Sequence, residues 1–436
     1  MLKILRNAWS IPELRKKILV TLGLFLLFRL GTHISVPGVQ RAVIYMMSSQ
    51  GGLVGLMDLF SGGGLLNISL FALGVMPYIN SSIILQLLNV VIPSLEKLAK
   101  EGGLEGQRKI AQITKYVTLG LAAIQSVSYA FFLYPSILNE MGIKVNLLVA
   151  PESIMLKIFV SFILFVGSFL LVWLGEVMTE NGIGNGVSLI IFAGVISKIL
   201  PGIGQVIENI RGGSATWFGL VFGLAIFAVF IGAVIFAYEA ERRVPVQYAK
   251  RIVGNRMYGG QSTYIPIRMI QGGVLPIIFA SSVMMFPQII GRFFPADNWW
   301  NVIFVEPLKM QTSWLYNVIF FLLIVFFTYF YTSITYNPPE LAENLRKQGG
   351  FIPGVRPGDA TAKYFQSVLS KVTLPTAVFL GALAIIPNFI LKGNMQLNNL
   401  FVGGTGILIV IGVALETVAQ IESFMTMRSY EGFLRK

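Results

Sequence analysis

The chain has 436 residues, of which 55% are hydrophobic and only 12% are charged, about half the charged fraction of soluble domains. Cysteine is absent, which excludes disulfides, thiolate metal sites and cysteine nucleophiles, and there is a single histidine. The charges, with a formal net value of +13, lie in clusters between apolar runs of membrane length. This composition predicts a polytopic membrane protein.

Apolar segments long enough to cross a bilayer recur along the whole chain. They cover approximately residues 18–35, 70–92, 114–134, 155–175, 183–200, 215–238, 269–290, 312–334, 372–391 and 402–421. The first lacks a small-residue cleavage site, so we interpret it as a retained span. With ten spans and a cytoplasmic N-terminus, most of the Lys and Arg residues are cytoplasmic, as the positive-inside rule requires. Both termini are then expected in the cytoplasm.

Residues 59–95 contain no charged side chain, yet this run is too long for one span. A single helix of that length would measure about 55 Å, against a hydrocarbon core of about 30 Å. The glycines at 62–64 and Pro77 also interrupt it. We therefore expect a short, non-spanning element followed by a spanning helix. Such an element survives at membrane depth only where protein buries it or where it lines a cavity.

Ten spans divide into five plus five, here residues 1–200 and 201–436, and an odd number gives the halves opposite orientations. A short sequence pattern that occurs in both halves, which we call the echo, supports this inverted repeat. G-V-M-P-Y-I at 74–79 is followed by Ser81 and Ser82, and G-V-L-P-I-I at 273–278 is followed by Ser281 and Ser282. Helices that Gly or Pro interrupts at corresponding positions of the two repeats indicate a functional site.

The two echo helices carry polar residues at membrane depth: Asn80, Ser81, Ser82 and Gln86 in the first, and Gln271, Ser281 and Ser282 in the second. Each interhelical hydrogen bond of this kind contributes about 0.6 kcal/mol, which holds an interface without locking it. Simple helix association and a gating role explain these residues equally well.

Few charges fall within the predicted spans, so a pore through this bundle would be apolar. Val75, Ile79, Ile191, Ile278 and the stretch 407–409 lie near the middle of their spans. Ordinary packing explains each one alone, but together they could form a hydrophobic constriction that blocks ions by dewetting. N-G-I-G-N-G at 181–186 resembles a phosphate cradle only superficially, and we expect it to open a helix through close-packing glycines.

Two long cytoplasmic loops, about 239–268 and 336–371, are basic and contain turn signals such as P-G-V-R-P-G at 353–358. Topology determination alone explains part of this charge. Ordered basic loops also favour docking of an acidic partner, namely an anionic lipid, nucleic acid phosphate or an acidic protein surface. The candidate docking residues are Arg242, Arg243, Lys250, Arg251, Arg256, Arg346, Lys347, Arg356 and Lys363.

Eight short motifs, in order along nearly the whole chain, match one known family. They are F-S-G-G-G (60–64), A-L-G-V-M-P-Y-I (72–79), W-L-G-E (173–176), N-G-I-G-N-G-V-S (181–188), Y-A-K-R (248–251), Q-S-T-Y-I-P (261–266), F-I-P-G-V-R-P-G (351–358) and T-A-K-Y (361–364). On these motifs the chain resembles the SecY family of protein-conducting channels.

The resemblance implies an all-α membrane protein of ten transmembrane helices, in two inverted five-helix halves around an hourglass pore. It implies a non-spanning plug helix after the first span, formed by Leu56, Met57, Asp58, Leu59, Phe60, Ser61, Gly62, Gly63, Gly64 and Leu65. The implied pore ring contains Val75, Ile79, Val187, Ile191, Ile278 and Ile409. The implied lateral gate, through which hydrophobic segments leave for lipid, contains Asn80, Ser81, Ser82, Gln86, Ser281 and Ser282.

The resemblance also implies a function and partners. The function is passage of unfolded preproteins across the bacterial plasma membrane, and lateral release of membrane-protein helices into it. The implied partners are the small subunits SecE and SecG, the SecA ATPase, the ribosome, signal sequences and nascent chains, and anionic lipids. The SecA ATPase or the ribosome supplies the energy, so neither cofactor nor enzymatic activity is expected here. Arg356 corresponds to the family's key docking arginine.

Two other classes of protein are alternatives. A secondary solute carrier built on inverted repeats would need a coupling carboxylate at the bilayer midplane, where the sequence offers little beyond Glu416. An intramembrane enzyme would need clustered acid–base or metal ligands, and one histidine without cysteine argues against it.

Overall fold

The structure is a computed structural model of the chain. It describes residues 9–39, 52–100, 103–133, 153–213, 216–248, 251–253, 256–258, 262–291, 294–295, 298–308, 313–393 and 404–434. Lys250 of the predicted docking set lies outside these residues. The side chains of Leu56, Arg251 and Arg256 also lie outside the description.

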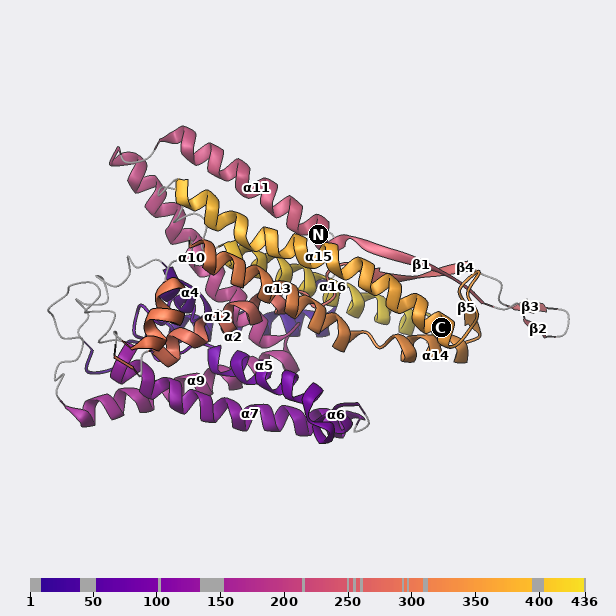
Figure 1. Ribbon diagram of the computed structural model, residues 1–436, viewed down its shortest axis with the longest axis horizontal. Coiled ribbons are helices and arrows are strands. Elements are labelled where there is room, and N and C mark those ends of the chain that lie inside the picture. The colour runs from indigo at the N-terminus through magenta and orange to yellow at the C-terminus, as the bar shows by residue number, and fades with distance from the viewer. Residues whose placement is uncertain are drawn as a thin grey trace.

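Long helices dominate the described chain and run roughly along one axis, with a few strands at one end (Figure 1). The long helices are α2 (Pro12–Gly31), α5 (Met76–Val91), α7 (Gly103–Ser128), α9 (Ile154–Asn181), α10 (Gly186–Arg211), α11 (Trp217–Glu239), α12 (Leu275–Gly291), α13 (Trp314–Thr335), α15 (Asp359–Gly393) and α16 (Gly404–Leu434). Shorter helical elements are α4 (Gly52–Phe60), α6 (Pro93–Lys100), η1 (Tyr129–Leu133), η2 (Asn301–Val305), η3 (Glu306–Leu308) and α14 (Pro338–Lys347).

Several of these helices can cross a membrane. By length and composition 6 described helices qualify: α9, α10, α11, α15, α16 and α13, the last counted together with α14. The pair α5 and α6, bent by 105° at the junction, is a further candidate, and α12 is apolar but has only 17 residues. Each predicted apolar segment overlaps a described helix, as a multi-pass membrane protein requires. The count of ten spans stays a prediction.

The uncharged run at 59–95 divides into a short helix and a longer one, as the sequence predicts. Helix α4 ends at Phe60, turns cover residues 61–75, and α5 begins at Met76, later than the expected start near residue 70. Gly62 and Gly74 have φ of 66° and 59°, in the left-handed region that favours glycine. Pro77 lies in the first turn of α5, where its missing N–H would have no helical partner.

The junction between α9 and α10 depends on close backbone contact. The Asn185 side chain caps α10 by accepting hydrogen bonds from the N–H groups of Val187 (3.1 Å) and Ser188 (3.2 Å). A Cβ on Gly186 would lie only 1.9 Å from the carbonyl oxygen of Gly175 in α9. This geometry confirms that the glycine-rich stretch opens a helix through close packing.

Strands in the two long basic loops are a feature that the all-helical prediction missed. Strand β1 (Glu241–Tyr248) pairs antiparallel with β4 (Ser262–Arg268), and β5 (Gly350–Phe351) pairs with the other edge of β1. A second ribbon pairs β2 (Arg251–Val253) with β3 (Arg256–Tyr258). In β1, Val244 and Val246 are buried while Arg243 and Pro245 are exposed, which is the period of a strand. Outside these loops, the predicted apolar segments are helical over most of their length.

One large apolar core joins the two halves of the chain. Its buried members come from α2, α4, α5, α9, α10, α11, α12, α13, α15 and α16. Because helices from residues 1–200 and from 201–436 contribute to the same cluster, the boundary between the halves lies inside the core. The site therefore has to be sought where the two halves meet.

We predict that Gly186→Ala destabilises the protein. The added methyl group would clash with the Gly175 carbonyl, and overpacking of this kind costs about 1–3 kcal/mol. Thermal unfolding of the purified protein should show a lowered midpoint. Gly232→Ala in α11 is the control, because a Cβ there meets nothing within 4 Å and alanine favours a helix over glycine by about 1 kcal/mol. Equal midpoints for the two variants would contradict the close-packing account.

Candidate functional site

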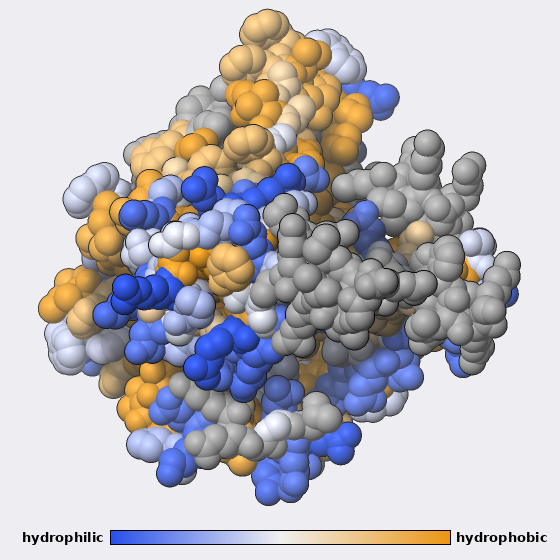
Figure 2. Space-filling view, turned by 90° about the vertical axis from the view of Figure 1, so that its right-hand side faces the viewer, coloured by the Kyte–Doolittle hydropathy of each residue, from blue (hydrophilic) through white to orange (hydrophobic). Residues whose placement is uncertain are grey.

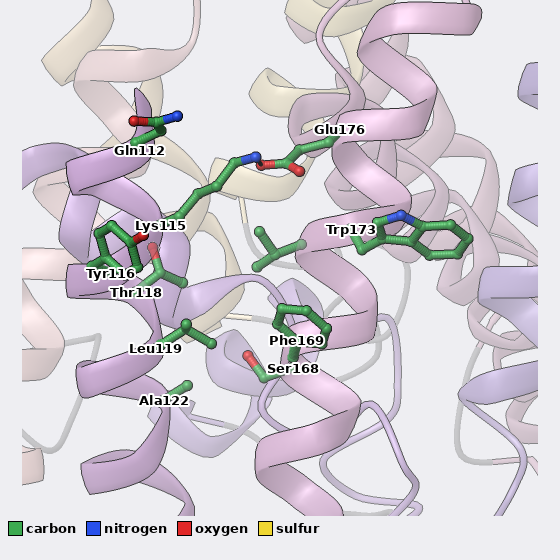
Figure 3. A pocket seen from close by; sticks show the side chains of 11 residues that line it. Gln112, Lys115, Tyr116, Thr118, Leu119, Ala122, Ser168, Phe169, Trp173 and Glu176 are labelled. Atoms are coloured by element: carbon green, nitrogen blue, oxygen red, sulfur yellow. Dashed lines mark ion pairs between the residues drawn. The ribbon is translucent and has the colours of Figure 1, made fainter. Parts of the chain in front are cut away.

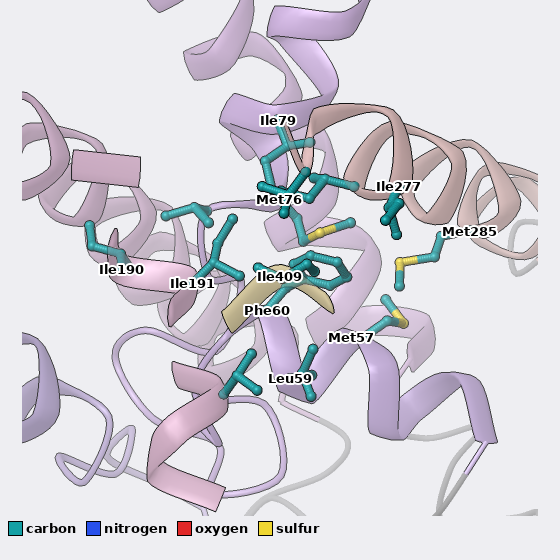
Figure 4. Packing of buried hydrophobic residues seen from close by; sticks show 14 of the residues in the cluster. Met57, Leu59, Phe60, Met76, Ile79, Ile190, Ile191, Ile277, Met285 and Ile409 are labelled. Carbon is teal, nitrogen blue, oxygen red and sulfur yellow. The ribbon is translucent and has the colours of Figure 1, made fainter. Parts of the chain in front are cut away.

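Helix α4 lies inside the bundle although it has only nine residues. Met57, Leu59 and Phe60 are at most 5% exposed and belong to the core cluster shared with α5, α10, α12 and α16. Figure 4 shows their side chains gathered with those of Ile79, Ile191 and Ile409. Such a short helix cannot cross a bilayer, and surrounding protein buries it, as its position requires.

The described residues of the predicted plug form one folded segment. All of them are buried except Gly63, which is half-buried. The Asp58 carboxylate accepts hydrogen bonds from the Leu66 N–H (2.9 Å) and the Ser61 hydroxyl (3.4 Å), and the Ser61 hydroxyl accepts one from the Leu65 N–H (2.9 Å). These bonds hold the glycine turn against the end of α4.

Five of the six predicted ring residues come together in the core. Val75, Ile79, Ile191, Ile278 and Ile409 are between 0% and 3% exposed and share the cluster with Phe60 of α4. Val187 is half-buried at the edge of this cluster, and its Cγ2 would touch a Cβ on Gly175 in α9 at 3.2 Å. These five ring positions are thus buried in the same apolar cluster as α4, and they do not line open water.

The predicted gate residues divide into two groups. Asn80 and Ser282 are buried, and their side-chain polar atoms have no hydrogen-bond partner within the described part of the chain. The others bond within their own helix or to another one: Ser81 bonds Thr118 of α7 and Tyr78 of its own helix, Ser281 bonds the Ile277 carbonyl, and Gln86 bonds Ser82. Ser81 therefore contacts α7, and this separates it from the interface between α5 and α12.

The starts of α5 and α12 have the same backbone geometry. Gly74 and Gly273 have φ of 59° and 57°, each directly before a buried valine and the first turn of its helix. A Cβ on Gly273 would lie 1.8 Å from the Glu416 carboxylate of α16, which accepts a hydrogen bond from the Val274 N–H. Glu416, an unassigned charge in the sequence, thus caps the start of α12.

The docking residues whose side chains are described are all exposed, and the end of the bundle that carries the strands is rich in hydrophilic residues (Figure 2). Arg346 and Lys347 pair with Glu343 at 2.8 Å and 3.9 Å. Arg243 pairs with Glu241 at 2.8 Å, and this hydrogen bond raises the pKa of Arg243, which stays charged. Exposed pairs of this kind contribute little, so these cations remain available to a partner.

The two basic loops form a single unit, which we call the platform: β1, β4, β5, α14 and the first turns of α15. Strand β5 pairs Phe351 with Gln247 and Gly350 with Tyr248. Beneath it lies a separate core of Val244, Val246, Ile267, Leu345, Ile352, Phe365 and Leu369. Arg356 and Lys363 are therefore exposed residues of the same folded unit as Arg242 and Arg243.

The family model named SecY matches residues 69–418, which include α5, α12, the platform and about half of α16. The chain belongs to the SecY family. Curated proteins named "Protein translocase subunit SecY" agree with this assignment along the full length. The protein from Streptomyces scabiei is 42% identical over 443 residues, covering 100% of both chains. The protein from Mycobacterium bovis is 45% identical over 439 residues, covering 97% of both.

Solved structures of channels have the same fold. A protein-conducting channel covers 94% of this chain and 92% of its own, with a TM-score of 0.68 and 19% identity. A SecY structure that addresses how the plug domain stabilises the closed channel gives a TM-score of 0.66 at 18% identity with the same coverage. A channel from a canine ribosome complex gives 0.63 at 18% identity, again with the same coverage. At these identities the likeness shows the SecY fold alone.

A groove on the bundle lies apart from the predicted ring and plug residues. A groove of about 440 Å³ between α7 and α9 is lined in part by Tyr116, Trp173, Lys115 and Glu176 (Figure 3). Lys115 and Glu176 form an ion pair at 2.9 Å across it. None of the predicted ring or plug residues of this SecY-family chain lines the groove.

Three polar residues around the plug segment escaped the sequence analysis as site residues. The sequence pattern singled out neither Arg29 in the first span nor Ser197 and Lys198 in the fifth. Both Arg29 and Lys198 contact residues 58–62. A charged side chain at membrane depth pairs with another charge or with a backbone carbonyl. This rule applied to the lone Lys of the fifth span would have identified the contact.

We predict that Phe365→Ala loosens the platform of this SecY-family chain without changing the bundle. Phe365 is fully buried in the platform core, and removing a buried ring costs about 3–5 kcal/mol. Thermolysin should cleave the cytoplasmic loops faster in the variant. Gln366→Ala, at the exposed neighbouring position, is the control and should be cleaved like the parent protein. Equal cleavage of both variants would refute a shared platform core.

Proposed function

We propose that this chain is the channel subunit of a bacterial protein translocase. It passes unfolded preproteins across the plasma membrane and releases transmembrane helices sideways into it. The observation that carries this proposal is the burial of Val75, Ile79, Ile191, Ile278 and Ile409 in the same apolar cluster as the non-spanning helix α4, in a SecY-family chain. A solute carrier is not favoured, because the relatives are translocase subunits and the structural neighbours are protein-conducting channels.

The ring and the plug act in different states. Aliphatic side chains carry no charge and change rotamer easily, so a ring of them can close around a moving chain while excluding ions. In the resting state α4 and residues 61–65 occupy the space beside the ring and complete the barrier. A translocating chain displaces this plug and takes its place within the ring. The pore itself is passive, so this chain is not an enzyme.

The lateral gate is the contact between α5 and α12. Asn80 and Ser282 are buried with unsatisfied polar atoms, and each such group weakens the closed interface by about 1–3 kcal/mol. Water that reaches these atoms when the helices part relieves this cost. Apolar packing between α5 and α12 therefore holds the gate closed. A hydrophobic helix that enters between them replaces this packing.

The architecture consists of ten spans in two inverted halves, residues 1–200 and 201–436. The matched left-handed glycines at 74 and 273, each before a buried valine and a helix start, support the repeat. The gate helices α5 and α12 are then equivalent elements of the two halves. The distribution of Lys and Arg supports cytoplasmic termini and a cytoplasmic platform.

The platform binds the partners that drive transport. Its exposed arginines and lysines suit the acidic surfaces of the SecA ATPase and ribosomal RNA, and anionic lipid headgroups. Structural neighbours in canine and yeast ribosome-bound complexes support the ribosome as a partner. The small subunits SecE and SecG complete the complex.

Reconstitution tests this function. Vesicles that contain the chain with its SecE and SecG subunits should protect a signal-bearing precursor from protease when SecA and ATP are added. Arg356→Glu should lower protected precursor by about tenfold, because it reverses a docking charge, while pore conductance through an opened channel stays unchanged. Arg211→Glu, an exposed cation at the far end of α10, should transport normally. Transport by Arg356→Glu at the parental rate would remove Arg356 from the docking surface.

Deletion of residues 55–66 tests the plug. We expect the deleted chain to insert into membranes and to leak ions at rest, because the ring alone then has to exclude them. Single-channel recording in planar bilayers measures the leak. An inserted protein with the resting conductance of the parent would show that α4 is not the plug.

A further inference from the structure

Two cations of the bundle wall contact the plug segment. Arg29 lies in α2, and Lys198 lies at the middle of α10. Arg29 contacts Gly62 and Ser197, and Lys198 contacts Asp58. We call these five residues the plug anchor. They lie at one side of an otherwise apolar cluster formed by Leu59, Phe60 and the ring residues.

Lys198 forms an ion pair with the Asp58 carboxylate through Oδ2. Asp58 is 2% exposed and the Lys198 side chain 25%, so the pair is buried at the acid and reaches solvent only at the base. The other carboxylate oxygen accepts the hydrogen bonds from within the plug segment. Lys198 thus links the Asp58 carboxylate of the plug segment to helix α10.

Arg29 joins three elements. Its Nη1 donates hydrogen bonds to the carbonyl oxygen of Gly62 (3.1 Å) and to the hydroxyl of Ser197 (3.2 Å). The Ser197 hydroxyl donates in turn to the Gly194 carbonyl in α10 (2.7 Å). The guanidinium therefore fixes the plug turn to both α2 and α10.

Glycines in α10 and α16 allow the plug segment to pack closely against these two helices. A Cβ on Gly194 would lie 2.9 Å from the Cα of Gly62, and a Cβ on Gly406 of α16 would lie 3.1 Å from Leu59 Cδ1. Any larger side chain at 194 would push the plug turn away from α10. The approach of the two backbones and the position of the anchor are therefore linked.

We propose that Arg29 and Lys198 are positioning residues that hold the plug in its closed position through the Gly62 carbonyl and the Asp58 carboxylate. Signal-driven opening has to break this anchor, so the anchor sets the threshold at which the channel opens. The proposal rests on the plug assignment above.

Loss of either charge of the Asp58–Lys198 pair should favour the open channel, because the pair is buried only while the plug is closed. Removing one partner leaves the other charge unpaired only while the plug is closed, because water reaches both when it leaves. Breaking a buried pair from one side is destabilising whatever the net value of the intact pair. Single-partner variants therefore shift the equilibrium toward the open channel.

The test uses the reconstituted complex with three variants. Asp58→Asn keeps the shape and an oxygen for the Leu66 N–H but removes the charge, Lys198→Ala removes the other partner, and Asp58→Lys with Lys198→Asp reverses the pair. We expect each single variant to raise the resting conductance about tenfold and to export a precursor with a defective signal sequence. The reversed pair should return both readouts toward the parent.

Lys115→Ala is the matched control, because it breaks an ion pair between α7 and α9 away from the plug. It should leave resting conductance unchanged. Parental conductance in both single variants, while deletion of residues 55–66 leaks, overturns the anchor but keeps the plug. A deletion that does not leak instead refutes the plug assignment itself.

Discussion

A backbone amide at membrane depth finds no water, so every non-helical stretch there has to bond within the protein. Residues 61–75 meet this requirement through turns: the Gly63 N–H donates to the Asp58 carbonyl and the Ser69 N–H to the Gly64 carbonyl, both at 2.9 Å. The Val36 N–H donates to the Ile68 carbonyl at 2.9 Å, which ties the segment to the chain after α2. These internal hydrogen bonds let a non-helical segment fold inside a bundle of long apolar helices.

Apolar packing and polar contacts have different parts in this arrangement. The cluster around Phe60 and Ile409 excludes water, but dispersion and hydrophobic contacts are non-directional and allow sliding. Hydrogen bonds and ion pairs have fixed geometry, and near the plug they come from α2 and α10. An apolar seal with a few directional contacts at its side can be both tight and displaceable.

Local signals in the sequence predicted local structure well. The glycines at 62–64 and Pro77 placed the break, and Val75, Ile79 and Ile278 were expected at the pore because they lie near the middle of their spans and because the family resemblance implies it. Contacts between distant residues were not predictable in this way. The β1–β5 pairing joins loops about a hundred residues apart through two residues only, and the Lys198–Asp58 pair spans 140 positions. The direction of Ser81 depends on how α5 is rotated within the bundle, which its own sequence does not determine.

The ribbon of β1 and β4 has a fixed root. The Met269 N–H donates to the Ala240 carbonyl at 2.9 Å, directly where α11 ends and a few residues before α12 begins. The ribbon is therefore attached at its base to the end of α11 and, through residues 269–274, to the start of α12. The start of α12 thus has two attachments, the ribbon on one side and Glu416 of α16 on the other.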